Sequence, residues 1–237
     1  MELSERKKRI LKAIVDEYID TAEPVGSGTI ACKYDRSCST ATIRNEMADL
    51  EGMGYLDKPH TSAGRIPSSR GYRWYVNTVL PDCGLSSDEQ IAIHSALDKQ
   101  LRDFDEIIAQ ASKLISRLTN YTVIASDCFE ENLNKSVYTD GVVNIFNHPE
   151  YRNLEKARRL IGFIDSRDSI YEIISGFTGE KSIKITIGDE NSFEDLKDCS
   201  VVVSHYFDSG ERKGGIGIIG PTRMNYRKVV SSLDIVT

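Results

Sequence analysis

The sequence lacks long apolar runs, paired cysteines and clustered histidines. No stretch approaches the roughly 20 apolar residues that a membrane-spanning helix needs, and the start MELSERKKRI has no apolar segment typical of a signal peptide. The five cysteines include no C-x-x-C pair, and the four histidines are scattered. These absences argue against a disulfide framework, a metal site and a membrane span. They predict a soluble protein of a reducing cytoplasm.

Acidic residues are missing from residues 58–81, although the chain of 237 residues has a net charge of -6. The first 80 residues hold 12 Lys or Arg against 11 Asp or Glu, whereas the rest holds 18 against 25. The acid-free run begins with KPHTSAGRIPSSRGYR and carries Lys58, Arg65, Arg70 and Arg73. Duplex DNA presents one phosphate charge per roughly 1.7 Å, so a surface that binds it avoids carboxylates. The run favours a nucleic-acid partner, with a merely solvated basic loop as the alternative.

Three amphipathic segments precede this run. Residues 4–21 repeat apolar side chains at a helical spacing, Ser27 is expected to cap a short second helix, and Ser39 is expected to cap a third over residues 40–52. A strand at 54–58, a loop and a helix capped by Ser68 follow. A helix-turn-helix followed by a basic β-loop predicts a winged helix over residues 1–80.

The third helix has one core-facing side and one small, hydrogen-bonding side. Ile43, Met47 and Leu50 lie at i, i+4 and i+7, which turns Asn45 outward between two alanines, with Thr42 and Arg44 on the flanks. Arg pairs with guanine and Asn with adenine in the major groove, although an ordinary surface helix has the same periodicity. The DNA-contacting residues predicted for the whole unit are Ser39, Thr40, Thr42, Arg44, Asn45, Lys58, His60, Thr61, Ser62, Arg65, Arg70 and Arg73.

The second part, residues 86–237, is predicted to be an α+β domain. A long helix carries an apolar seam from Leu97 to Leu118, which faces either its own domain or a dimer partner. Strands are expected at residues 121–126, in a hairpin turning at Asp140 and Gly141, and at 182–188, 199–207 and 214–220. Two helices are expected around residues 151–164 and 169–175, and a last one over 225–236.

The same part contains one glycine motif that matches a nucleotide-binding fingerprint outside its usual structural context, and it offers no nucleophile and base typical of a catalytic site. Residues 215–220 spell G-x-G-x-x-G, but the spacers are all Ile, so we expect a strand in which glycine permits close packing. His205 and Cys199 are expected in the core. We therefore predict no cofactor and no enzymatic activity.

Three stretches resemble the HrcA family of heat-inducible transcription repressors. They are LSERKKRILKAIVDEYIDTAEPVGSGTIA, STATIRNEMADLEGMGYLDKPHTSAGRIPSSRGYRWYV and IGIIGPTRMNYRKVV. The resemblance implies a repressor of chaperone operons that binds an inverted-repeat operator as a homodimer and depends on the GroE chaperonin. It also implies a GAF-like second domain with an inserted dimerisation element. This chain has only SDCFEENLNKSVYTDG where members carry several more strands, so the element is abridged or residues near 127–135 are absent.

Two other functions remain open at this point. One is a ligand-responsive regulator whose GAF-like domain binds a small molecule, and the other is an enzyme with a DNA-binding appendage. The second needs a nucleophile and base that the sequence does not offer.

Overall fold

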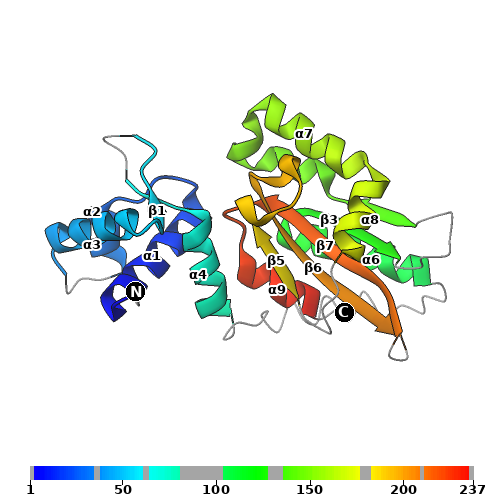
Figure 1. Ribbon diagram of the computed structural model, residues 1–237, viewed down its shortest axis with the longest axis horizontal. Coiled ribbons are helices and arrows are strands. Elements are labelled where there is room, and N and C mark those ends of the chain that lie inside the picture. Colours follow the sequence, from blue (N-terminus) through cyan, green and yellow to red (C-terminus); the bar gives the residue numbers. More distant parts are fainter. Residues whose placement is uncertain are drawn as a thin grey trace. The chain divides into compact units, whose positions relative to one another are not determined.

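The chain forms two compact units, residues 1–82 and 83–237 (Figure 1). The computed structural model describes residues 3–34, 38–60, 64–80, 104–127, 136–176, 183–208 and 211–234. Across those residues, no helix is both long and apolar enough to cross a bilayer.

The first unit is a winged helix-turn-helix, as the sequence predicts. Two two-residue strands pair antiparallel, with Leu56 opposite Pro67, and form the base of the wing. The elements are α1 (Glu5–Thr21), α2 (Ser27–Lys33), α3 (Thr40–Gly52), β1 (Leu56–Asp57), β2 (Ile66–Pro67) and α4 (Ser69–Val79).

Apolar side chains at helical spacing hold α1 against α3. Ile10 and Ile14 of α1 are buried, as are Ile43, Met47 and Leu50 of α3. Burying one such side chain contributes about 1.5–3 kcal/mol relative to exposure. This core fixes which side of α3 faces outward.

The N-cap of α2 differs from the sequence prediction, which was wrong by one residue. Ser27 is the first residue of the helix, and Gly26 occupies the cap position without a side-chain hydrogen bond. The backbone of Val25 exchanges two hydrogen bonds with Arg65, with N···O distances of 2.8 and 2.9 Å. Because this bridge ties Val25 to the wing, the chain is still extended at Gly26 and the helix begins after it.

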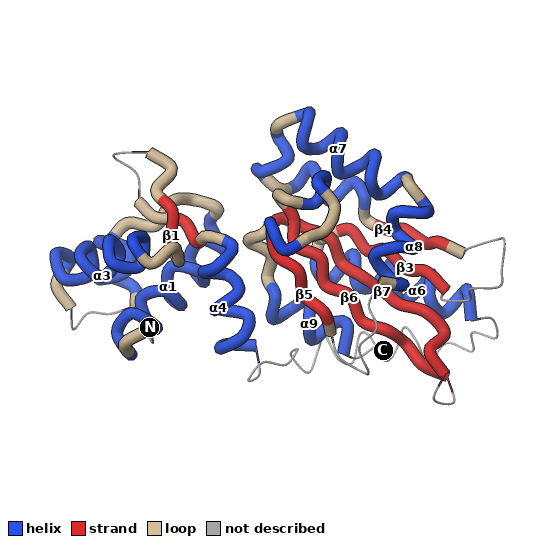
Figure 2. Tube along the Cα trace, in the orientation of Figure 1, coloured by secondary structure: helices blue, strands red, loops and turns tan. Residues whose placement is uncertain are grey.

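The second unit is a five-stranded antiparallel sheet with helices on both faces (Figure 2). The strand order is β4-β3-β7-β6-β5. Helices α6 and α9 pack on one face, and α7 and α8 cover the other. The bounds are α6 (Phe104–Thr119), β3 (Thr122–Asp127), β4 (Val137–Asp140), η2 (Val142–Asn147), η3 (Pro149–Arg152), α7 (Leu154–Asp165), α8 (Arg167–Ser175), β5 (Lys184–Ile187), η4 (Gly188–Glu190), η5 (Glu194–Leu196), β6 (Cys199–Asp208), β7 (Glu211–Pro221) and α9 (Tyr226–Asp234).

The glycine motif at residues 215–220 lies inside β7, as predicted, and forms no nucleotide loop. A Cβ on Gly217 would lie 3.1 Å from the Ile124 side chain and 3.3 Å from that of Val203, so glycine allows close packing there. His205 is buried, with Nε2 2.8 Å from the carbonyl oxygen of Ile174. Cys199 is buried as well, which confirms the expectation that both residues belong to the core.

The hairpin predicted at Asp140 and Gly141 is wrong. Strand β4 ends there, Gly141 has a φ of 70°, and residues 142–147 form the 3-10 helix η2. The turn buries Ile145 in the core beneath α7 and lets Asn144 donate to the carbonyl oxygen of Tyr121. Core burial therefore overrides the β propensity of VVNIF.

The apolar seam of α6 faces its own unit over its described part, where Ile108, Ala111 and Ile115 are buried. The α6 helix packs on β3 and β4. The seam residues before Phe104 lie outside the described residues.

Gly64 tests how the wing attaches to the rest of the first unit. A Cβ there would lie 2.4 Å from the backbone oxygen of Val25. Gly64→Ala is expected to lower the free energy of unfolding by about 1–3 kcal/mol because the bridge between Val25 and Arg65 must move.

The control is Gly28→Ala in α2, where a Cβ meets nothing within 4 Å. That change is expected to be neutral, or stabilising by up to about 1 kcal/mol through helix propensity. Urea denaturation of both variants provides the comparison, and equal midpoints for Gly64→Ala and the wild type would contradict the account.

Candidate nucleic-acid interface

Helix α3 presents a row of small and polar side chains to solvent. Ala41, Arg44, Asn45 and Ala48 are exposed. At its N-terminus, the Ser39 hydroxyl accepts a hydrogen bond from the backbone N–H of Thr42 at 3.1 Å, which confirms the predicted cap. The first turn therefore begins at a fixed point, with Thr40 exposed beside it.

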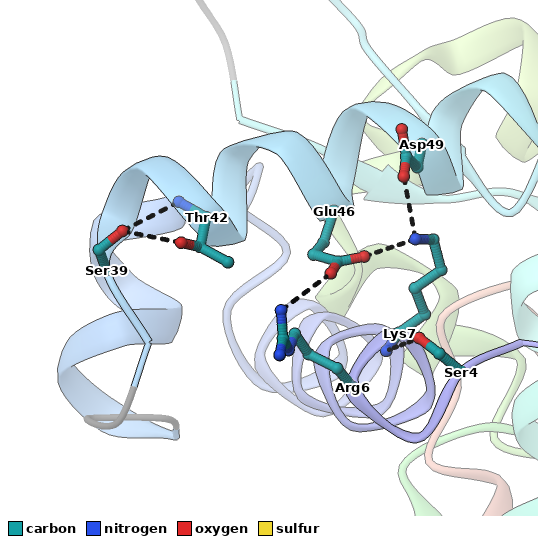
Figure 3. A network of polar contacts seen from close by, with 7 residues as sticks. All are labelled: Ser4, Arg6, Lys7, Ser39, Thr42, Glu46 and Asp49. Carbon is teal, nitrogen blue, oxygen red and sulfur yellow. Dashed lines mark hydrogen bonds and ion pairs between the residues drawn. The ribbon is translucent and has the colours of Figure 1, made fainter.

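Two carboxylates on the flank of α3 that faces α1 are paired with cations. Figure 3 shows Arg6 and Lys7 reaching from α1 toward Glu46 and Asp49. Lys7 Nζ lies 2.6 Å from Glu46 Oε2 and 2.9 Å from Asp49 Oδ2, and Arg6 Nη1 lies 3.5 Å from Glu46 Oε1. These hydrogen bonds, first to Glu46 and then to Asp49, raise the pKa of Lys7 above its usual value.

The third carboxylate of α3 is paired on the opposite flank. Arg65 Nη2, at the start of the returning wing strand, lies 2.7 Å from Glu51 Oε2. The Arg65 side chain is only 15% exposed. All three acids of α3 thus have a cation at contact distance, so none adds an uncompensated negative charge beside the exposed row. A DNA phosphate would be repelled far more by free carboxylates in these places.

The basic residues of the acid-free run have different surroundings. Lys58 and His60, after β1, are exposed. Arg70 donates from Nη1 to the carbonyl oxygen of Met53 at 2.8 Å and stacks 4.5 Å above the Tyr55 ring, so it also holds the turn before β1. Arg73 on α4 is half-buried. Thr61 and Ser62 lie outside the described residues.

The predicted contacts therefore fall into two groups. Five of them share one end and the outer side of α3: Ser39, Thr40, Thr42, Arg44 and Asn45. The others lie along the wing and the start of α4, where Arg65 and Arg70 also make contacts within the first unit.

Sequence reasoning missed Arg6 and Lys7. The signal was present as the basic run RKKR at residues 6–9 and the spacing of Glu46 and Asp49 on α3. Periodicity places each residue on a face of its own helix, but only the packing of α1 on α3 reveals that these two faces meet.

Fold and surface together define a DNA-binding protein of the winged helix-turn-helix class. Residues 2–79 match the family model of the winged helix-turn-helix transcription repressor HrcA, DNA-binding, and residues 124–230 match that of the HrcA protein C terminal domain. The chain belongs to the HrcA family of heat-inducible transcription repressors.

Curated relatives match along the whole chain. The heat-inducible transcription repressor HrcA of Acetivibrio thermocellus is 32% identical over 330 positions, covering 99% of this chain and 94% of the relative. That of Pelotomaculum thermopropionicum is 32% identical over 332 positions, covering 100% and 95%. Since this chain has 237 residues, both alignments contain long gaps on its side.

One solved structure shares the fold. The crystal structure of a hypothetical protein at 2.2 Å resolution has a TM-score of 0.85 and 20% identity, and it covers 99% of this chain and 96% of that one.

Ser39 allows helix capping to be separated from DNA contact. Ser39→Ala is expected to cost about 1 kcal/mol of stability because the cap is lost, whereas Ser39→Asp keeps a capping oxygen and stays within a few tenths. On DNA the order should reverse, because the aspartate places a carboxylate at the exposed end of α3. We expect Ser39→Asp to bind duplex DNA about tenfold more weakly than Ser39→Ala.

Thermal melting and fluorescence anisotropy on the same two samples would check both orders. Tighter DNA binding by the aspartate variant than by the alanine variant would place this end of α3 away from the duplex.

Proposed function

We propose that this protein represses chaperone operons by binding an inverted-repeat operator as a homodimer in the cytoplasm. One winged helix reads only a few base pairs, so two heads related by a two-fold axis are needed for useful specificity. The observation that carries the proposal is the outward side of α3, which is small, hydrogen-bonding and flanked by compensated acids.

In this proposal α3 enters the major groove with its N-terminal half. Asn45 pairs with an adenine edge, Arg44 with guanine, and Thr42 contacts a neighbouring base. Ser39 and Thr40 lie where the helix N-terminus favours a phosphate. The exposed alanines 41 and 48 let the helix backbone come close to the base edges.

The wing and the start of α4 would hold the sugar-phosphate backbone. This role is assigned to five residues because they lie within the acid-free run: Lys58, His60, Thr61, Ser62 and Arg73. Arg65 and Arg70 would combine it with their bonds to Glu51 and Met53, so replacing either should also loosen the wing.

The second unit would supply the contacts between protomers and those to the GroE chaperonin. The exposed large apolar side chains of its described part are Val143, Phe146 and Leu154, at 74%, 59% and 79% exposure. All three lie on η2 and at the start of α7, and clustered exposed apolar residues are typical of interaction surfaces.

A ligand-responsive regulator is the second candidate, and one cavity favours it. About 180 Å³ of space lies beside β5, β6 and α8, lined by apolar residues such as Phe193 and Val203, with Glu172 and Lys184 also in its lining. A small molecule with both apolar and charged parts suits such a lining.

The base-reading assignment can be tested with the duplex that the protein selects from random sequences and a scrambled duplex. Asn45→Ala and Arg44→Ala should each cost about 1–3 kcal/mol on the selected duplex and much less on the scrambled one. Lys58→Ala is the contrast: it should weaken both duplexes alike and make the salt dependence shallower by about 0.9 in the log–log slope. Equal losses on both duplexes for Asn45→Ala would refute base reading.

Heat sensing is expected to follow from stability alone. Only dimers with both units folded can span the operator. A modest loss of folding stability therefore causes a large fall in the concentration of repressor that can bind DNA. The second part of the chain is the expected weak point because residues 81–237 hold 18 Lys or Arg against 25 Asp or Glu, and this net charge of -7 repels itself. On one temperature ramp, operator release should coincide with dissociation or unfolding, followed by anisotropy, light scattering and near-UV circular dichroism. Release well below both would contradict this and favour a ligand in the cavity.

A further inference from the structure

The carboxylate of Glu46 has two cationic partners, and they differ in character. Lys7 lies 2.6 Å from one oxygen and is shared with Asp49, and its side chain is 15% exposed. Arg6 lies 3.5 Å from the other oxygen, and its side chain is 49% exposed. Figure 3 shows both reaching from α1 to the side of α3, farther along that helix than the Ser39 cap.

The two ion pairs of Glu46 differ in how much they contribute to stability. A half-exposed ion pair at 3.5 Å is screened by water and contributes little, whereas the shared ammonium is largely shielded by the two helices. Glu46 therefore keeps Lys7 as a contact if Arg6 moves to another anion, and this ammonium then balances one of the two negative charges of Glu46 and Asp49. Arg6 is also the better phosphate ligand, since its guanidinium binds two oxygens at once.

The location of Arg6 fits such an exchange. It lies in the first turn of α1, whose N-terminus is fixed by the Ser4 hydroxyl accepting from the backbone N–H of Lys7 at 3.3 Å. A helix N-terminus favours anions. The side of α3 that faces this turn carries both Thr42 and Glu46, and Thr42 lies between Glu46 and the Ser39 cap, so the turn adjoins the proposed base-reading end.

We propose that Arg6 is a DNA-phosphate contact that leaves Glu46 for the backbone of the duplex, and that Lys7 is a positioning residue that stays between Glu46 and Asp49 and halves their charge. The inference rests on the proposed DNA-binding function and adds a second contact element, α1, to α3 and the wing. The competing explanation is that Arg6 merely fastens α1 to α3.

The dependence of one substitution on Arg6 separates these explanations. If Arg6 exchanges partners, Glu46→Gln removes a competitor and a negative charge, so the full chain should bind both the selected and the scrambled duplex about 2- to 5-fold more tightly. Arg6→Ala should weaken both by about 3- to 10-fold and make the salt slope shallower by about 0.9. If the pair only fastens the helices, Glu46→Gln should change binding by the same factor in the Arg6→Ala background as in the wild type, whereas the exchange predicts that most of the tightening is lost in that background.

The role of Lys7 in DNA binding must be tested with a measurement whose outcome differs from that of a simple packing defect. Lys7→Gln should weaken DNA binding because two carboxylates lose their cation beside the duplex. Adding Glu46→Gln and Asp49→Asn to that variant should restore the affinity at least to that of the wild type, because the charge of the cluster then rises by one unit, as it does in Glu46→Gln alone. A merely structural lysine would not be rescued by removing its partners.

The matched control is Lys12→Ala, a cation of the same helix whose ion-pair partner, Asp16, also lies on α1. Its salt slope should equal that of the wild type. An unchanged slope for Arg6→Ala, or weaker binding by Glu46→Gln, overturns the exchange. Failure of the wild type to prefer its selected duplex would instead refute the proposed function.

Discussion

A helix that approaches a phosphate backbone cannot carry uncompensated carboxylates, and this constraint organises the first unit. Helix α3 has Glu46, Asp49 and Glu51 in its second half. The packing of α1 brings Lys7 and Arg6 to two of them, and the returning wing brings Arg65 to the third. The same contacts that neutralise the helix therefore also fix its position between α1 and the wing.

The basic residues of the acid-free run therefore fall into two groups, one exposed to solvent and one that makes contacts within the unit. Lys58 and His60 are exposed, whereas Arg65 and Arg70 bind Glu51 and the carbonyl oxygen of Met53. The absence of acid in the run thus has a structural use as well as an electrostatic one. A basic residue in such a surface is informative only once its partner is known.

Local signals predicted most of the first unit. The caps at Ser39 and Ser68 and the spacing of Ile43, Met47 and Leu50 were enough to define α3, its outer side and the winged helix. Long-range contacts decided the rest: the pairing of Lys7 with Glu46 spans 39 residues, and the bridge from Val25 to Arg65 moved the start of α2. In the second unit, burial of Ile145 replaced an expected strand by a 3-10 helix. Local sequence patterns do not predict these contacts, because they join residues that are far apart in the sequence.

The central claim is that the outer side of α3 lies in the major groove. The most direct measurement is photocrosslinking of the full chain to its selected duplex, with a photoreactive residue placed singly at Ala41, Ala48 or Lys113. The account predicts crosslinks to bases from both α3 positions and none from Lys113, an exposed residue of α6. Crosslinks that form at Lys58 but at neither alanine would contradict it, because the wing would then bind DNA without α3.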